Sequence, residues 1–152
     1  MKTVGKKFGR KSKSVTAQQR LAGCEIRDME IFIKQAKVTY TEFPEHTIDY
    51  LARMYGTELP KVMSLAQKDK QYAASLNTDG EISAQVVYAI REEMACTLMD
   101  VLIRRTGIGT LDHPGKEVIE SIAQITAQEL GWSKERTESE IETAVKTLSL
   151  PG

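Results

Sequence analysis

The sequence predicts an all-α fold, a compact bundle of about six helices around one long central helix. Apolar side chains recur at steps of three and four along most of the chain, the spacing that places them on one face of a helix. No segment shows the strict alternation of a half-buried strand. Glycine, proline and turn residues fall mainly between the periodic stretches. A chain of 152 residues is long enough for one domain with a core.

Residues 1–25 are expected to form a basic flexible arm or connector ahead of a helical C-terminal accessory domain at 26–152. Residues 1–24 hold seven Lys and Arg residues and no acid, so they carry a net charge of +7 and the remaining residues carry −7. The arm has too few apolar residues to order itself alone. A contact with nucleic acid, with anionic lipid or with an acidic partner surface remains open, because clustered bases bind all three.

The first half of the domain is predicted to contain three short helices. The first spans about 26–37 and the second about 45–55, which ends at Gly56 because glycine tolerates the backbone conformation of a helix stop. Thr57 can cap the third helix, at about 58–68.

The central helix is predicted to be a single rod over residues 82–106, after an irregular loop at 69–81. The stretch has neither proline nor glycine, and its apolar residues lie on several faces, so it needs neighbours on several sides. Ser83 is the predicted N-cap, and Arg104 and Arg105 occupy the last turn, where cations interact well with the negative end of the helix dipole.

Two further helices are predicted to complete the bundle. Glycines at 107–109 and 113–115 separate the central helix from a helix that begins near Lys116 and ends at Gly131. Ser133 should cap a last helix that extends to about Leu148.

Three ordered motifs resemble a known family. Val86-Val-Tyr-Ala-Ile-Arg-Glu-Glu-Met-Ala95 and Thr97-Leu-Met-Asp-Val-Leu-Ile-Arg-Arg-Thr106 form the first, Leu51-Ala-Arg-Met-Tyr-Gly-Thr57 the second and Ile125-Thr-Ala-Gln-Glu-Leu-Gly-Trp-Ser133 the third. They resemble the C-terminal helical domain of the FAD-dependent glycerol-3-phosphate dehydrogenases and the related alpha-glycerophosphate oxidases. A weaker resemblance links Thr16 to Gly23 with the connector that precedes this domain in the family.

The resemblance covers about residues 44–148 and implies a role within a larger enzyme. The parent enzyme would oxidise sn-glycerol 3-phosphate to dihydroxyacetone phosphate by hydride transfer to FAD, and pass electrons to quinone or oxygen. In this family the flavin and substrate residues belong to the preceding domains, so the resemblance assigns no catalytic or cofactor residue to this chain. It implies an inactive domain fragment, with the flavin and substrate domains as partners and peripheral association of the parent with the inner face of the membrane.

The residues themselves offer no reactive centre. Gly107-Ile-Gly109 follows a helix and lacks the third glycine of a dinucleotide-binding loop, so we expect no FAD site in this chain. His46 and His113 have no partner at metal-ligand spacing, so we expect no metal site. Cys24 and Cys96 have no activating neighbour, and Cys96 is expected inside a helix, so we expect no catalytic residue. Two cysteines do not form a disulfide framework, which favours a reduced, cytoplasmic protein.

Charged residues of the central helix are the candidate contacts with other domains. Glu92 and Glu93 diverge by about 100° on a helix, so they should not act as paired acids; one is expected to pair with a base and the other to face solvent. Arg91, Arg104 and Arg105 could either bond locally or brace the domain against the flavin and substrate domains, because Arg forms bidentate pairs across interfaces.

Two features bear on how these arginines act. Asp100 and Arg104 form an i,i+4 pair in the favourable orientation, which supports the local alternative. The family commonly continues the Arg-Arg-Thr run with a basic or bulky residue, whereas this chain has Gly107, so the contact just after the helix should differ.

Two alternative functions do not require an attached enzyme. Ala52, Gly56 and Val62 have the spacing of a helix-turn-helix, with residues 58–68 as the recognition helix. That helix offers few base or phosphate contacts and the globular part is net acidic, so nucleic-acid binding is disfavoured. The other alternative is a helical protein-interaction module. No apolar run follows the charges of the arm, so we do not expect it to be a signal peptide, and no stretch is long and apolar enough to predict a membrane span.

Overall fold

The computed structural model describes residues 25–110 and 113–149, and within them it confirms the all-α prediction. The only sheet-like contact in these two ranges is an isolated antiparallel bridge between Ser75 and Ile82. The predicted arm, apart from Glu25, lies outside the described residues. The α-helices are α2 (Met29–Thr39), α3 (Glu45–Tyr55), α4 (Leu59–Lys68), α5 (Ser83–Arg91), α6 (Lys116–Leu130) and α7 (Lys134–Leu148). A 3-10 turn, η1 (Gly56–Glu58), precedes α4, and a π-helix, η2 (Asp100–Arg105), follows α5.

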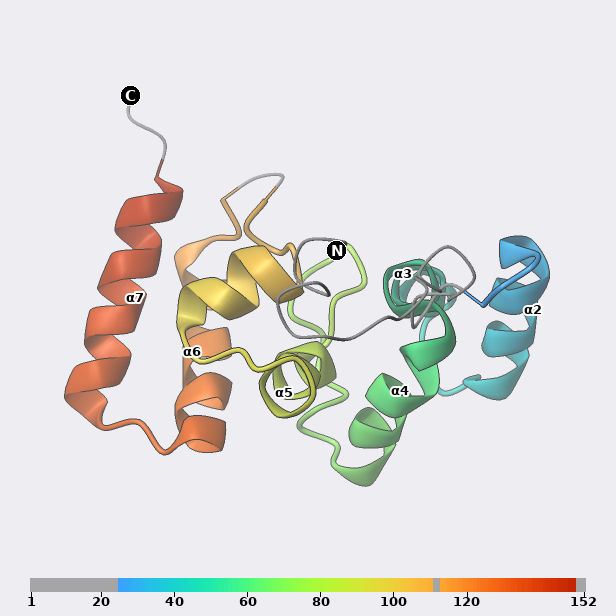
Figure 1. Ribbon diagram of the computed structural model, residues 1–152, viewed down its shortest axis with the longest axis horizontal. Helices are drawn as coiled ribbons and strands as arrows, with labels where there is room; N and C mark the ends of the chain where they lie inside the picture. Colours follow the sequence, from blue (N-terminus) through green and yellow to red (C-terminus); the bar gives the residue numbers. More distant parts are fainter. Residues whose placement is uncertain (1–24, 111–112, 150–152) are drawn as a thin grey trace, which may run out of the picture.

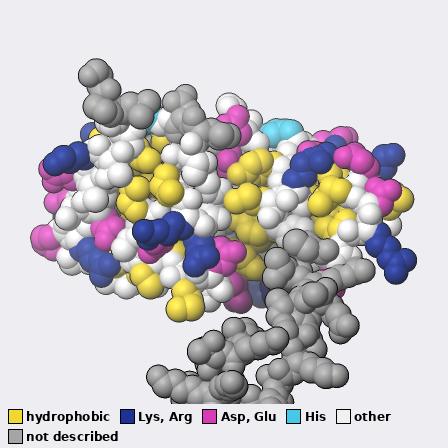
Figure 2. Space-filling view, turned by 45° about the horizontal axis from the view of Figure 1, so that its top comes forward, with side chains coloured by type: hydrophobic (Ala, Val, Ile, Leu, Met, Phe, Trp, Pro, Cys, Tyr) yellow, Lys and Arg dark blue, Asp and Glu magenta, His cyan; other side chains and the backbone are white. Residues whose placement is uncertain are grey.

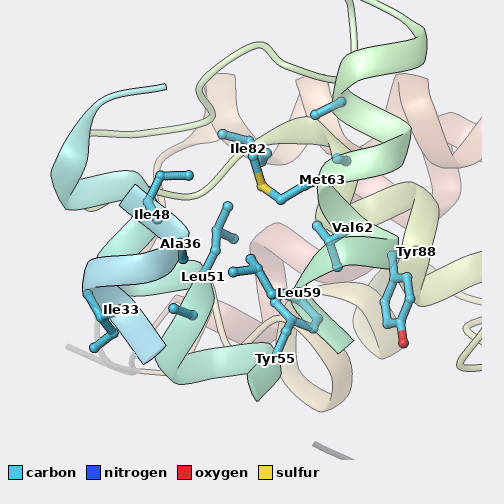
Figure 3. Packing of buried hydrophobic residues seen from close by; sticks show 13 residues of the cluster. Ile33, Ala36, Ile48, Leu51, Tyr55, Leu59, Val62, Met63, Ile82 and Tyr88 are labelled. Carbon is cyan, nitrogen blue, oxygen red and sulfur yellow. The ribbon is translucent and has the colours of Figure 1, made fainter. Parts of the chain in front are cut away.

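Helix α5 lies between helices α2 to α4 on one side and α6 and α7 on the other, as Figure 1 shows. Its side chains contribute to two hydrophobic cores. One core joins α2, α3 and α4, and the other joins η2, α6 and α7. Ile82 and Tyr88 pack into the first core, which is drawn in Figure 3, whereas Val86 and Ala89 pack into the second. Every residue from 81 to 89 is buried, because α5 has neighbours on all sides.

The central segment is not one long rod, so the prediction for residues 82–106 is wrong. Helix α5 ends at Arg91, residues 92–97 are not helical, and a helical run resumes at Leu98 and continues as η2. We call residues 92–97 the break. The backbone N–H of Thr106 donates to the carbonyl of Val101 at 3.0 Å, a five-residue step that matches the wider π-helical turn.

The predicted start of α5 is also corrected by one residue. Ile82 is the N-cap and Ser83 is the first helical residue. Isoleucine has no side-chain acceptor, so the first N–H groups of α5 donate to backbone carbonyls, Ser83 to Ala74 at 2.9 Å and Ala84 to Tyr72 at 2.8 Å. The buried Gln85 satisfies the N–H of the N-cap residue itself, because its Oε1 accepts from Ile82 at 3.0 Å.

The other helix boundaries are close to the predictions, with two corrections. Helix α3 covers the predicted residues, and α6 begins at Lys116 and ends at a left-handed Gly131. Helix α2 begins at Met29 rather than near Ile26, because Asp28 caps it through the N–H of Ile31 at 3.1 Å.

The caps of the third and last helices differ in outcome. Thr57 lies inside η1 and is not a cap, since Glu58 is the N-cap of α4. Ser133 caps α7 as predicted, and its Oγ accepts from the N–H of Arg136 at 3.2 Å. Among the described residues, none of the helices is both long enough and apolar enough to cross a membrane.

Candidate functional site

The break and its flanks hold the three predicted inter-domain arginines. Arg91 is the last residue of α5, and Arg104 and Arg105 are the last residues of η2. All three side chains are exposed. The structure thus places the predicted residues at the two ends of an interrupted helix rather than along a continuous one.

Arg91 is bound to helix α6 by a bidentate ion pair. Its Nε lies 2.7 Å from Oε2 of Glu129, and its Nη2 lies 2.8 Å from Oε1. The Tyr72 hydroxyl donates to the same carboxylate at 2.9 Å, and the Tyr72 ring lies 5.9 Å from the guanidinium. The bonds from Arg91, together with the one from Tyr72, outweigh the cost of partial burial and lower the pKa of the Glu129 carboxyl. Arg91 therefore ties α5 to α6.

Asp100 organises the second end of the break. Its Oδ2 accepts from the backbone N–H groups of Cys96 at 3.1 Å and Thr97 at 3.0 Å, and its Oδ1 pairs with Nη1 of Arg104. The Thr97 hydroxyl accepts in turn from the Asp100 N–H at 3.1 Å, so the two residues form a capping box. Partial burial opposes ionisation, but the bonds from Arg104, Cys96 and Thr97 prevail and lower the pKa of Asp100 to about 2.

Helix α7 fixes the break from the other side. Oε2 of Glu140 accepts from the Leu98 N–H at 2.9 Å, and Nη2 of Arg136 donates to the Cys96 carbonyl at 3.3 Å. Arg136 also lies 4.7 Å above the ring of Trp132 and 3.8 Å from Glu140. The backbone of the break is therefore held by side chains from two elements.

Met94 occupies the most unusual position in the break. Its φ is +60°, which makes it the only non-glycine residue with positive φ in the part of the chain that the structure describes. Its side chain is 82% exposed. Left-handed backbone at a residue with a long side chain costs about 1 kcal/mol. Cys96, predicted inside a helix, lies instead in the break and is exposed, because the helix ends before it.

Glu93 points toward the interior while Glu92 is exposed. Oε2 of Glu93 is buried and accepts no hydrogen bond from the described residues. Burial raises the pKa of the Glu93 carboxyl, and the charge of Arg105 opposes this rise. The prediction that one of the two glutamates forms an ion pair is wrong, since neither does so in the described residues: Glu92 faces solvent, and Arg105 stabilises Glu93 only from a distance.

Residues 107–110 do not form a dinucleotide-binding turn. Such a turn joins a strand to a helix, whereas this one follows the π-helix. One surface groove, of about 740 Å³, is lined by Asp79 and by side chains from α2 and α3, among which Lys37 pairs with Glu45 and Arg53 with Asp49. We found no group of three metal-binding side chains in the part of the chain that the structure covers.

The helix-turn-helix positions have structural roles in this domain. Ala52 and Val62 are fully buried in the first core. Of the residues that would contact DNA, Lys61 pairs with Glu58, and Gln67 donates to Glu42 at 2.7 Å. Acidic groups thus occupy two of the expected contacts.

Comparison with known proteins gives one family. The family model for the C-terminal domain of alpha-glycerophosphate oxidase matches residues 14–137. A probable mitochondrial glycerol-3-phosphate dehydrogenase of Dictyostelium discoideum is 32% identical over 74% of this chain and 18% of its own length. A glycerol-3-phosphate dehydrogenase of Synechocystis is 27% identical over 91% of this chain and 26% of its own length. The mitochondrial glycerol-3-phosphate dehydrogenase of Mus musculus is 38% identical over 65% of this chain and 14% of its own length.

The shares of length show that this chain corresponds to only part of each relative. The chain spans about a quarter or less of these relatives. The matched residues include helices α2 to α6 and only the first turn of α7, and the match begins within the stretch expected to be an arm. The chain belongs to the family of the C-terminal domain of alpha-glycerophosphate oxidase.

Proposed function

We propose that this chain is the C-terminal domain of an FAD-dependent glycerol-3-phosphate dehydrogenase. The preceding domains of such an enzyme would bind FAD and oxidise sn-glycerol 3-phosphate to dihydroxyacetone phosphate. The domain described here would supply no reacting group and would pack against them. The observation that carries the proposal is the family match over residues 14–137, in relatives of which this region is only a small part.

The arginines at the break are the proposed contacts with those domains. Arg91 and Arg104 keep 47% and 70% of their side chains exposed although both form ion pairs. Arg105 is exposed and forms no ion pair with a described residue. A guanidinium with free N–H groups can bond a second acceptor while it keeps the first.

The proposal includes a location. We place the domain in the cytoplasm, with the parent enzyme held peripherally at the inner face of a membrane, as the family resemblance implies. Fractionation of cells that produce the parent enzyme, followed by a wash in high salt, tests this part separately.

Two experiments test the proposed function. The purified chain is first mixed with FAD, and we expect no bound flavin after gel filtration; stoichiometric yellow protein would refute a non-catalytic role. Residues 14–149 of this chain then replace the matched region of the Dictyostelium relative. We expect this chimera to retain FAD and oxidise glycerol 3-phosphate, whereas the relative truncated before its C-terminal domain should lose activity or stability. A chimera no better than the truncated enzyme would contradict the proposal.

A further inference from the structure

The ion pairs around the break share an asymmetry. Their bases are 47–70% exposed while their acids are only 10–26% exposed. In the other ion pairs between described residues the acids are 36–82% exposed. The pairs at the break are Lys61 with Glu58, Arg91 with Glu129, Arg104 with Asp100 and Arg136 with Glu140. Each pair is neutral, but each one presents its positive group to the outside.

Five bases lie near the break, and each is linked to it by its place in the sequence or by an interaction. Lys61 interacts with Glu92 and Arg105 with Glu93. Arg136 donates to the carbonyl of Cys96. The remaining two are Arg91, which immediately precedes the break, and Arg104, whose partner Asp100 caps the break. We call these five residues the basic ring; it lies on a domain whose residues 25–152 are net acidic.

Met94 is the exposed apolar residue of the break, which the basic ring flanks. The capping box of Thr97 and Asp100 and the bonds from α7 hold the backbone that follows it. The left-handed conformation projects an 82% exposed thioether side chain from this fixed loop. A flexible apolar side chain on a fixed backbone suits insertion into a pocket of a partner.

We propose that the basic ring and Met94 form the face by which this domain docks onto the preceding domains of its parent enzyme. The partner surface would carry carboxylates and backbone carbonyl oxygens around an apolar socket for Met94. This inference rests on the proposed function and adds the chemistry of the partner.

The geometry favours a protein partner over a membrane. The three arginines that form ion pairs are held in fixed orientations by partly buried carboxylates. Fixed guanidinium groups suit the discrete acceptors of a folded protein. Binding to a fluid anionic surface relies instead on flexible bases and several inserted apolar side chains. Met94 is the single large apolar residue that is strongly exposed in the break.

Hydroxyl-radical footprinting tests the docking face with a control inside the same molecule. Met94 and Met54 are both exposed in the isolated domain, at 82% and 43%, and Met54 lies in the groove between α2 and α3. Oxidation of both methionines is measured by mass spectrometry in the isolated chain and in the chimera with the Dictyostelium relative. We expect oxidation of Met94 to slow about tenfold in the chimera, because a docked hot-spot residue is fully desolvated, while Met54 changes little.

Charge variants in the chimera supply the second measurement. Arg104→Glu combined with Arg105→Glu should restore oxidation of Met94, whereas Lys116→Glu combined with Lys134→Glu, on exposed pairs elsewhere, should not. Circular dichroism of each isolated variant confirms that it folds. The Arg104→Glu change removes the partner of Asp100, so the milder pair Arg104→Gln and Arg105→Gln is measured beside it.

The outcomes separate this inference from the proposed function. If the chimera is active and Met94 stays as reactive as in the isolated chain, the domain packs through another face and the inference is wrong. If the chimera is inactive and neither methionine is protected, the proposed function fails with it. If vesicles of phosphatidylglycerol protect Met94 in the isolated chain as strongly as the chimera does, the face binds lipid and the protein-docking inference is overturned.

Discussion

Replacement of Asp100 by Asn tests whether the break is an ordered cap or a loose interruption. Asn keeps the shape of Asp and one acceptor oxygen but removes the charge that holds Arg104 and the two backbone N–H groups. The pKa of Asp100 falls from its ordinary value of 3.8 to about 2. A shift of this size corresponds to about 2.5 kcal/mol of stability, and we expect about 2 kcal/mol because exposed Arg104 is partly screened by solvent.

The pH dependence of this loss has a defined sign. The folded-state pKa of Asp100 is depressed, so the carboxylate stabilises the fold fully above pH 3.8 and progressively less as pH falls toward 2. The difference in unfolding free energy between wild type and Asp100→Asn should therefore be constant near neutral pH and fall to roughly half by about pH 3.

Urea denaturation followed by circular dichroism measures both quantities. Asp69, a described aspartate at the end of α4 whose side chain accepts a single bond from the Gln71 N–H, provides the matched Asp→Asn control. The control should change the unfolding free energy by less than about 0.5 kcal/mol. A loss at Asp100 as small as that of the control, or one that does not diminish at acid pH, would refute the view that this carboxylate fixes the break.

Three further predictions concern single side chains. Gly80→Ala should lower the free energy of unfolding by more than about 2 kcal/mol, because φ is +109° and a Cβ would lie 3.2 Å from Thr47 Cα and Tyr50 Cβ. Gly131→Ala, at φ +65° with no atom within 4 Å of the added Cβ, should lower it by only about 1 kcal/mol. Equal losses in urea denaturation would contradict this. Met94→Asn should leave the isolated domain as stable or up to about 0.5 kcal/mol more stable, because Asn tolerates positive φ, while it weakens docking in the chimera; a clear loss of domain stability would show that Met94 has a packing role. Glu129→Ala should lower the free energy of unfolding by about 2 kcal/mol, because it removes the acceptor of Arg91 and of the Tyr72 hydroxyl. Glu142→Ala, at an exposed position on α7, should be nearly neutral in thermal melts. Similar effects at both positions would exclude the bridge between α5 and α6.

The helix pattern of this protein could be predicted because its signals are local. The faces of α3 and α6 follow from apolar periodicity, and their ends follow from Gly56 and Gly131. The Ser133 cap is likewise a matter of a few consecutive residues. Each of these signals needs no knowledge of the tertiary structure, which is why the boundaries agree with the structure.

The break could not be predicted from periodicity, because no glycine or proline marks it. The apolar residues keep helical spacing through Ala95 and Leu98, so a continuous helix satisfied the pattern. One signal was nonetheless present: Thr97 followed three residues later by Asp100 is the spacing of a capping box, which marks the start of a helix. Asp100 is both the predicted partner of Arg104 and a member of this capping box.

Parts of the site depend on distant elements and leave no local signal. Glu129 and Glu140 lie 38 residues from Arg91 and 42 from Leu98, and both are partners of the segment around the break. Glu129 and Glu140, the acid partners of Arg91 and Arg136, are largely buried only because α6 and α7 pack against the rest of the domain.

The break sets the orientation of the helical turns that follow α5. Tyr88 packs into the core with α3 and α4, and Leu98 packs into the core with α6 and α7. A continuous helix would fix the angle between these residues at about 100° per step, whereas the break lets the second half turn independently. The cost is one strained residue and a set of backbone N–H groups without helical partners. The carboxylates of Asp100 and Glu140 accept hydrogen bonds from those groups. The same carboxylates form ion pairs with the exposed side chains of Arg104 and Arg136. Two members of the basic ring, Arg104 and Arg136, are thus a direct consequence of how the broken helix is capped.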